Sequence, residues 1–469
     1  MKRAEEFINH AEILACLERA KEKANDKEYV REILKKSETL TPLSHEETAV
    51  LIQCEDKELI AEIHAAAGKI KDRIYGNRIV MFAPLYLSNY CVNNCKYCGY
   101  QHKNCELKRR KLTQEEIKDE IIALQDMGHK RLALEAGEDP VNCPIEYILE
   151  CIDTIYSVKH KNGAIRRVNV NIAATTVENY KKLKDAGIGT YILFQETYNK
   201  ERYEDLHPEG PKSNYAYHTE AMDRAMQGGI DDVGIGVLYG LYDYRYEVVA
   251  TMMHVEHLEE TFGVGPHTIS VPRLRPALGV TRENYPDLVS DDDFKKIVAV
   301  LRVSVPYTGI ILSTRETKEM RAELLNSGVS QVSAGSCTGV GGYSEKNACD
   351  CGENTAQFEV DDTRSMDEVL TGLIESGHIP SFCTACYREG RTGDRFMQLA
   401  KSGQICNVCQ PNALMTLMEF LSDYGSENAK AAAKKLYETE IPKIKNETIK
   451  QKTIEYLERI EKGERDFRF

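Results

Sequence analysis

Three cysteines on one short segment have the spacing of an iron–sulfur cluster loop. The segment SNYCVNNCKYCGY carries Cys91, Cys95 and Cys98 in the pattern C-x3-C-x2-C. Three thiolates can bind three irons of a 4Fe-4S cube and leave the fourth iron without a protein ligand. The amino and carboxylate groups of S-adenosylmethionine (SAM) can chelate that open iron, so the pattern predicts radical SAM chemistry. The competing interpretation, a zinc site short of one ligand, fits poorly because zinc sites use four ligands, often in C-x2-C pairs.

A second group of cysteines near the C-terminus permits two interpretations. Cys383, Cys386, Cys406 and Cys409 form two C-x2-C pairs with a 19-residue spacer, an arrangement that suits structural zinc. Cys383, Cys386 and Cys409 alone form C-x2-C-x22-C, which again offers three thiolates and one open iron. Spacing alone favours zinc slightly.

Composition and charge restrict the class of protein. The chain has 469 residues, 15 cysteines and a formal net charge of -13. Clustered cysteines in a reducing compartment are more often metal ligands or catalytic groups than disulfides. The acidic balance argues against a nucleic-acid partner, no apolar stretch reaches the roughly 18 residues of a membrane span, and the charged N-terminus lacks a signal core. We expect a cytoplasmic enzyme.

From about residue 79 onward, apolar strand-like runs alternate with amphipathic helical ones. Eight strands are expected, at 79–87, 131–137, 167–173, 190–196, 232–240, 267–274, 309–314 and 329–335. Continuous apolar strands separated by helices are typical of parallel strands buried on both faces. Eight such units predict an α/β fold, a (β/α)8 TIM-type barrel over 79–340, rather than an open doubly wound sheet. A helical extension (1–78) precedes the barrel, and a helical iron–sulfur domain (341–469) follows it.

Two of the expected helices have readable start signals. Thr113 with Glu116 forms a capping box before one helix, and Thr175 with Glu178 repeats the pattern before another. In such a box the threonine side chain and the glutamate side chain each bond an unpaired backbone amide.

Polar residues at several strand ends are candidates for binding SAM, because barrel active sites lie at the C-terminal ends of the strands. These candidates are Tyr97, Glu138, Asp139, Asn169, Asn171 and Glu196. The tyrosine can stack on adenine, the two carboxylates after the second strand can receive the ammonium group, and Glu196 can bind ribose hydroxyls. The two asparagines share one face of the third strand. A carboxylate at a strand end is about equally often a helix cap.

Motifs along nearly the whole chain resemble the radical SAM tyrosine lyases that mature FeFe-hydrogenase, the HydG family. The resemblance rests on YCVNNCKYCGY, AGEDPVNCP, NVNIAATTVENY, GTYILFQET, HTISVPRLRPA, QVSAGSCTGVGGY, CTACYREGRTGDRF and the later CQPNAL. The related tyrosine lyases of thiazole synthesis, the 2-iminoacetate synthases, share the barrel but lack the C-terminal cysteine segment. That segment separates the two families.

The resemblance implies a two-step chemistry. The reduced cluster on the first cysteine loop cleaves SAM to methionine and a 5′-deoxyadenosyl radical, which abstracts hydrogen from L-tyrosine; the Cα–Cβ bond then breaks to give p-cresol and dehydroglycine. Dehydroglycine becomes carbon monoxide and cyanide at a second cluster, held by Cys383, Cys386 and Cys409, which carries an extra iron bound to free L-cysteine. Expected partners are an electron donor and other hydrogenase maturation proteins. The alternatives are a thiazole-pathway tyrosine lyase with a zinc-stapled tail and a non-catalytic iron–sulfur carrier.

Some cysteines depart from the family pattern. The family uses three ligands in the second group, so Cys406 is surplus, and Cys409 is kept because it precedes the matching QPNAL. Cys349 and Cys351 also lie outside the pattern, and we interpret them as loop thiols.

The extra iron needs a protein ligand, and imidazole suits iron. His267 stands at the start of the sixth expected strand, at the bottom of the barrel, where a C-terminal domain would meet it. We therefore predict that His267 binds this iron. His254 and His257, on the preceding helix, are the rival candidates.

The carboxylate of tyrosine calls for a cationic partner. Arg315 follows the seventh expected strand in STRET, and an arginine fork suits a carboxylate. Ser313 and Ser336 are expected to assist it. Arg273 and Arg275, after the sixth strand, are alternatives, and any one of these arginines can equally form a structural ion pair.

Overall fold

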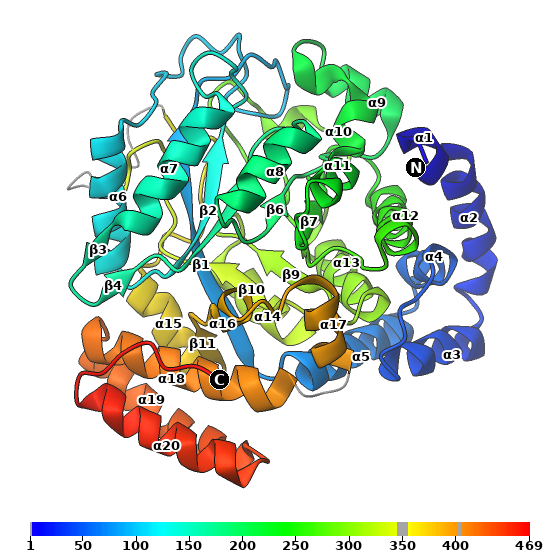
Figure 1. Ribbon diagram of the computed structural model, residues 1–469. Helices are drawn as coiled ribbons and strands as arrows, with labels where there is room; N and C mark the ends of the chain where they lie inside the picture. Colours follow the sequence, from blue (N-terminus) through cyan, green and yellow to red (C-terminus); the bar gives the residue numbers. More distant parts are fainter. Residues whose placement is uncertain (1, 345–354, 402–404) are drawn as a thin grey trace.

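The computed structural model describes residues 2–344, 355–401 and 405–469 (Figure 1). Cys349 and Cys351 lie outside the described residues, as does the side chain of Cys406. A parallel barrel stands at the centre of the described chain, with helices around it and helical segments before and after it in sequence.

Eight parallel strands close the barrel. Their order is β1-β2-β5-β6-β7-β8-β9-β10, and β10 pairs back onto β1, with Val80 opposite Gln331. The strands are β1 (Arg78–Ser88), β2 (Arg131–Ala136), β5 (Arg167–Asn171), β6 (Tyr191–Ile192), β7 (Val233–Gly236), β8 (Thr268–Ser270), β9 (Gly309–Leu312) and β10 (Gln331–Ser333). Each overlaps one expected range, so the predicted (β/α)8 barrel is confirmed and the open sheet is excluded. A small hairpin of β3 (Lys159–His160) and β4 (Gly163–Ala164) was not expected.

Helices between the strands cover the outside of the barrel. They are α6 (Gln114–Asp126), α7 (Ile145–Ser157), α8 (Val177–Asp185), α9 (Lys200–Leu206), α10 (Tyr215–Thr219), α11 (Ala221–Gln227), α12 (Tyr244–Phe262), α13 (Asp291–Ser304) and α14 (Lys318–Ser327). Apolar side chains such as Val168, Ile269 and Phe294 are fully buried in the core. This burial on both faces explains the continuous apolar strands in the sequence.

One of the two expected helix starts is correct and one is wrong. The Thr113–Glu116 capping box forms at the start of α6. At α8 the N-cap is Thr176, whose hydroxyl accepts the Asn179 amide, and not Thr175. The amide of Thr175 instead donates to the Tyr180 hydroxyl at 3.2 Å, which holds Thr175 outside the helix, so the helix begins one residue later.

The N-terminal helices pack on one side of the barrel, in blue in Figure 1. They are α1 (Ala4–Phe7), α2 (His10–Lys23), α3 (Lys27–Glu38), α4 (His45–Gln53) and α5 (Lys57–Ile74). Helix α4 packs on α12 and α5 packs on α13, so this extension covers the barrel helices around β8 and β9.

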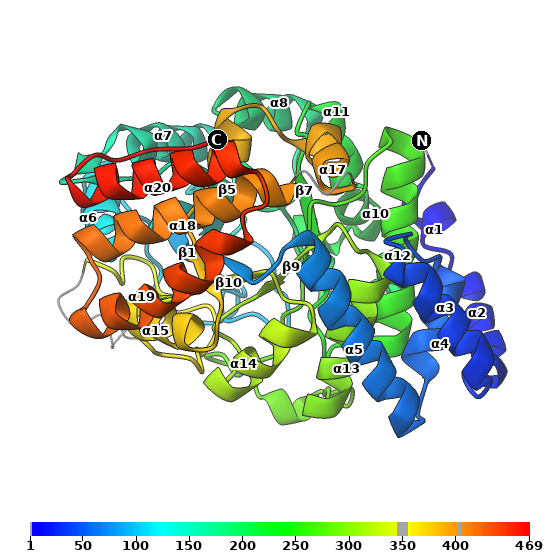
Figure 2. The ribbon, with the colours of Figure 1, turned by 90° about the horizontal axis from the view of Figure 1, so that it is seen from below.

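The C-terminal segment contacts the N-terminal end of β1, which is the bottom of the barrel. It contains α15 (Met366–Glu375), β11 (Ile379–Ser381), α16 (Ala385–Arg388), α17 (Gly393–Lys401), α18 (Ile405–Asp423), α19 (Glu427–Glu440) and α20 (Glu447–Glu461) (Figure 2). Strand β11 pairs in parallel with the first residues of β1, whereas β2 pairs with β1 from Ala83 onward. A fully buried ion pair between Lys130, just before β2, and Glu419 on α18 joins the two parts.

Candidate iron–sulfur active site

A cavity of about 210 Å³ opens among the barrel strands and the first cysteine loop. Cys91, Cys95 and Cys98 all line it, together with residues from the ends of several strands. The loop follows β1 directly, so the structure brings the three predicted ligands together at the mouth of the barrel. This is the end at which barrel enzymes place their reacting groups.

The loop after β2 and the C-terminal end of α9 hold the backbone of the cysteine loop. The amide of Val92 donates to the Glu138 carbonyl after β2 at 2.8 Å, and the amide of Lys96 donates to the Leu206 carbonyl at 3.0 Å. The loop after β2 comes so close that a Cβ at Gly137 would overlap the Tyr90 carbonyl oxygen, and only glycine fits such an approach. The positions of the cysteines are thus set by tertiary contacts on both sides.

The chemistry of the three thiols fits an iron–sulfur cluster. Burial raises the pKa of Cys91 and Cys95 above the ordinary thiol value and raises that of Cys98 to about 11. Such thiols keep their protons until a metal replaces them. The amide of Tyr100 donates to the Cys98 sulfur at 3.4 Å and the side-chain amide of Asn93 donates to the Cys91 sulfur at 3.8 Å, so donors are already in place for bound thiolates.

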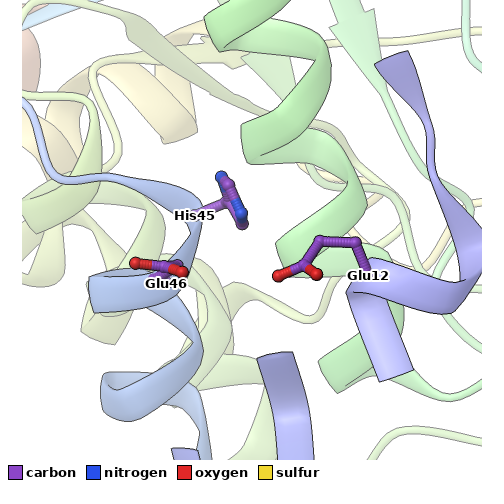
Figure 3. A group of neighbouring side chains, drawn as sticks. All are labelled: Glu12, His45 and Glu46. Carbon is purple, nitrogen blue, oxygen red and sulfur yellow. The ribbon is translucent and has the colours of Figure 1, made fainter. Parts of the chain in front are cut away.

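The spacing of the sulfurs is too wide for one metal ion. Three thiolates on one tetrahedral zinc lie about 3.8 Å apart, given Zn–S bonds of about 2.3 Å. In the described residues, the only three His, Cys, Asp or Glu ligand atoms that all lie within 4.8 Å of one another belong to Glu12, His45 and Glu46 (Figure 3). Neither described cysteine trio meets that spacing.

The three side chains in Figure 3 form ion pairs with residues outside the trio. Arg19 pairs with both Glu12 and Glu46, and the Nδ1 atom of His45 lies 2.7 Å from the Glu256 carboxylate. The charges of the trio are therefore already compensated by neighbouring side chains.

Five of the six predicted SAM-facing residues line the cavity. They are Tyr97, Glu138, Asn169, Asn171 and Glu196. The sixth, Asp139, does not line it; its carboxylate accepts the amides of Val141 and Asn142 and so closes a turn. The side-chain oxygen of Asn169 also accepts a hydrogen bond from the Arg167 guanidinium at 2.7 Å.

Tyr97 is held rigidly beside the cysteines. Its hydroxyl lies 2.8 Å from Nε2 of His207, whose Nδ1 lies 2.7 Å from the Tyr203 carbonyl. A carbonyl can only accept, so Nδ1 carries the proton and Nε2 accepts the Tyr97 hydroxyl. Burial lowers the pKa of His207 to about 3, so this ring stays neutral and the hydrogen bond persists at physiological pH.

Glu196 stands in a strained backbone conformation at the end of the β6 segment. Its φ is +69°, a left-handed value that non-glycine residues rarely adopt and that persists only where the surroundings enforce it. Its carboxylate accepts from the ammonium of Lys212 at 2.8 Å. Burial alone would lower the pKa of Lys212, but Glu196 and Cys95 raise it above the ordinary lysine value. A charged lysine thus faces the cluster loop.

Of the three candidate arginines Arg273, Arg275 and Arg315, only Arg315 has no carboxylate partner in the described residues. Arg273 pairs with Glu316 and Asp291, and Arg275 pairs with Glu316 and Asp361. The Arg315 guanidinium lines the cavity and lies 3.3 Å from the centre of the Phe358 ring. Its cationic charge is therefore available to a ligand carboxylate.

The two predicted serines are in different places. Ser313 lines the cavity, and its hydroxyl accepts the Arg315 amide at 3.4 Å. Ser336 does not line the cavity, and its buried hydroxyl has no hydrogen-bond partner among the described residues.

Sequence reasoning missed several ionisable residues of the cavity, and three of them carry charge chemistry. Lys212, Glu135 and Arg131 all line it. Burial raises the pKa of the Glu135 carboxyl well above its usual range, and burial lowers that of Arg131 to about 10 although Cys383 and Cys386 oppose the shift. Lys212 follows no strand and carries no sequence signal, whereas a polar residue inside the apolar RLALEAG run could have indicated Arg131 and Glu135.

The second cysteine site lies under the barrel. Cys383 follows β11, Cys386 is on α16 and Cys409 is on α18, and both of the latter pack on an apolar cluster that contains Phe396. His267, just before β8, contacts the Phe396 ring with centroids 5.0 Å apart. The structure thus brings His267 close to the thiols at the bottom of the barrel.

The rival histidines lie elsewhere. His254 is 2.8 Å from the Tyr198 hydroxyl and His257 is 2.8 Å from the Asp223 carboxylate. Both rings contact Phe7 of α1, so they belong to the contact with the N-terminal helices and not to the second cysteine site.

Two family models match the chain. The Radical SAM superfamily matches residues 85–254, and the Biotin and Thiamin Synthesis associated domain matches residues 270–379. The curated 2-iminoacetate synthase of Salmonella typhimurium is 28% identical over 340 residues, which cover 72% of this chain and 86% of the relative. No helix in the described parts of the chain has both the length and the apolar character that a membrane crossing needs.

Solved structures extend the similarity to the whole chain. A crystal structure of HydG, a maturase of the FeFe-hydrogenase, is 60% identical, with a TM-score of 0.95, over 99% of this chain and 100% of that one. The maturase HydG from Carboxydothermus hydrogenoformans is 42% identical, with a TM-score of 0.80, over 95% of this chain and 99% of that one. The similarity includes the C-terminal cysteine segment, and the chain therefore belongs to the HydG family of FeFe-hydrogenase maturases.

Proposed function

We propose that this protein cleaves the Cα–Cβ bond of L-tyrosine to p-cresol and dehydroglycine and then forms carbon monoxide and cyanide for the FeFe-hydrogenase active-site iron unit. The observation that carries the proposal is the presence of two thiol trios, one at the mouth and one at the bottom of a single barrel. Membership of the HydG family and similarity to 2-iminoacetate synthases support it.

Cys91, Cys95 and Cys98 hold the SAM-binding 4Fe-4S cluster in this proposal. When bound, the reduced cluster supplies the electron that cleaves SAM and starts the radical reaction. The protein contributes a buried cavity, which keeps a reactive radical from solvent. An external electron donor and other hydrogenase maturation proteins are the partners that this chemistry requires, and a reducing compartment such as the cytoplasm suits the thiols.

The cavity residues divide between SAM and tyrosine. Tyr97 stacks on adenine, Glu138 receives the SAM ammonium group, and Glu196 binds the ribose hydroxyls. Asn169 and Asn171 line the intervening wall. In the same proposal Asp139 shapes the turn beside Glu138 rather than meeting SAM, because Oδ1 accepts two backbone amides and Oδ2 accepts the side-chain amide of Asn142.

Arg315 binds the tyrosine carboxylate in this proposal, with Ser313 beside it. The support is that Arg315 lies in the cavity and forms no ion pair with a described carboxylate, whereas Arg273 and Arg275 are paired. A buried arginine without a counter-ion is costly unless a ligand supplies one. Ser336, outside the cavity lining, is not expected to touch the substrate.

Cys383, Cys386 and Cys409 hold the second cluster, and His267 binds its additional iron, to which free L-cysteine is also bound. The support is the wide spacing of the thiols and the approach of His267 to them from the barrel bottom. The thiazole-pathway alternative needs a single zinc at this place, and the spacing does not favour it.

Anaerobic reconstitution tests the proposal. The full chain with reductant, SAM and tyrosine should produce p-cresol, carbon monoxide and cyanide together. Cys383→Ser should keep p-cresol and lose both diatomic products, because only the second thiol trio is broken. Formation of p-cresol alone by the wild-type protein, with one zinc per chain, would instead support the thiazole-pathway alternative.

A further inference from the structure

His267 lies between two polar side chains that the proposed function does not use. Its Nε2 atom is 2.9 Å from the hydroxyl of Tyr387, the residue after the ligand candidate Cys386. Its Nδ1 atom is 3.6 Å from the carboxylate of Asp232, which precedes β7. The imidazole is therefore approached on both nitrogens, one from the barrel and one from the C-terminal segment.

The nature of the two neighbours decides which nitrogen carries the proton. The Asp232 carboxylate can only accept, so it favours the form of His267 with the proton on Nδ1. Nε2 then presents a lone pair, and the Tyr387 hydroxyl donates to it. His267 would bind a metal through this lone pair, which in this structure accepts the hydrogen bond from the Tyr387 hydroxyl.

Asp232 is built to support a histidine ligand. It is 2% exposed, and one of its oxygens accepts the Gly393 amide at 3.0 Å. Its other oxygen, Oδ2, is buried and has no hydrogen-bond partner among the described residues. Buried carboxylate oxygens seldom lack a partner, and metal-binding histidines usually donate their second N–H to a carboxylate. The oxygen nearest Nδ1 of His267 is Oδ1, which the Gly393 amide holds in place, and at 3.6 Å it makes an electrostatic contact with the imidazole rather than a hydrogen bond.

Tyr387 is held in position from its other side. The guanidinium of Arg167 lies over its ring, and the ring meets His267 edge to face at 82°. The hydroxyl is thus directed at Nε2 by packing on the ring face.

We propose that Asp232 and Tyr387 prepare His267 for the additional iron: Asp232 orients the imidazole, and the Tyr387 hydroxyl protects Nε2 until iron replaces it. In this exchange the iron–nitrogen bond forms and the O–H···N hydrogen bond breaks, with no change in oxidation state and no proton lost. Asp232 is a positioning residue, and Tyr387 is a competitor of the metal. The inference rests on the proposed function in taking His267 as the iron ligand.

Iron binding to the full chain tests the inference. The protein, carrying both clusters, is titrated with isotopically labelled ferrous iron and free L-cysteine, and the bound label is measured by Mössbauer spectroscopy. Removal of the competing hydrogen bond in Tyr387→Phe should tighten iron binding about threefold to tenfold. Loss of the carboxylate in Asp232→Asn should weaken it about tenfold to a hundredfold.

Two matched control residues, Tyr156 and Asp231, line the same pocket as Asp232 and Tyr387. Tyr156→Phe removes a hydroxyl that bonds the Gly187 carbonyl, and Asp231→Asn removes a carboxylate that pairs with Lys184. Neither contacts His267, so both should bind iron like the wild-type protein. Iron and sulfide content and circular dichroism establish that each variant is folded and carries its clusters.

The outcomes separate this inference from the proposed function. If His267→Ala still binds the labelled iron, the ligand assignment in the proposed function fails. If His267→Ala loses the iron but Tyr387→Phe binds no more tightly than Tyr156→Phe, or Asp232→Asn binds as tightly as Asp231→Asn, only the present inference is overturned. Should Asp232→Asn fail to assemble its clusters, the affinity of Tyr387→Phe decides alone, and weaker binding by that variant overturns it.

Discussion

Replacement of Arg315 gives the most direct test of how substrate is held. The guanidinium is inside the cavity, rests on the Phe358 ring and has no carboxylate partner among the described residues. Burial lowers its pKa below the ordinary arginine value, which reflects an incompletely compensated charge. Arg315→Met removes the charge while keeping a long apolar side chain, and Arg315→Lys keeps the charge but loses the planar fork.

The expected size of the effect follows from the lost ion pair. A hydrogen bond to a charged group contributes about 1.5–3 kcal/mol, and about 1.4 kcal/mol corresponds to a factor of ten in affinity. Arg315→Met should therefore raise the KM for tyrosine about 10-fold to 100-fold. Arg315→Lys should raise it less, by about threefold to tenfold, because a lysine cannot bind a carboxylate in bidentate fashion.

The assay is p-cresol formation at saturating SAM with varied tyrosine, with SAM binding measured separately. Arg273→Met is the matched control: it changes a neighbouring arginine that does not line the cavity and that pairs with the buried Glu316. This control should lose stability and keep its KM. An unchanged KM in a folded, cluster-loaded Arg315→Met protein would refute the assignment of Arg315.

Three other predictions address the cluster loop, the contact between barrel and tail, and the second site. Lys212→Met should weaken SAM binding, because it leaves the Glu196 carboxylate buried without its cation. The measurement is a SAM titration of the cluster's electron paramagnetic resonance spectrum, whose midpoint should move to higher SAM concentration. An unchanged midpoint contradicts this prediction. Lys130→Met should lower the free energy of unfolding by about 1.5–3 kcal/mol in denaturant titrations, because the buried Glu419 on α18 loses its ammonium partner and keeps only Arg166 as a cation among the described residues. A change below about 1 kcal/mol would exclude a stabilising pair. Cys409→Ser should lose the iron of the second cluster while Cys406→Ser keeps it, as iron and sulfide analysis would show; equal loss in both would point to zinc-like use of all four thiols.

Features that depend on short stretches of chain could be predicted from sequence. The C-x3-C-x2-C loop places all three thiols in the cavity lining, and the Thr113 capping box forms because its bonds join residues three apart. The apolar runs mark all eight barrel strands because burial on both faces requires them. The predicted N-cap of α8 was nevertheless wrong by one residue. Thr175 and Thr176 can both cap the helix, and the hydrogen bond from the Thr175 amide to the Tyr180 hydroxyl leaves the cap to Thr176.

The sequence by itself determined the barrel, the first cysteine loop and the family, because these depend on residue type and on separations of a few residues. Only the tertiary structure decided which of the candidate arginines forms no ion pair, and that Lys212 faces the cluster loop. It alone also placed Asp232 and Tyr387, which are far apart in the sequence, beside the two nitrogens of His267. The physical reason is that burial and pairing of charges depend on groups far apart in sequence, which no local pattern records.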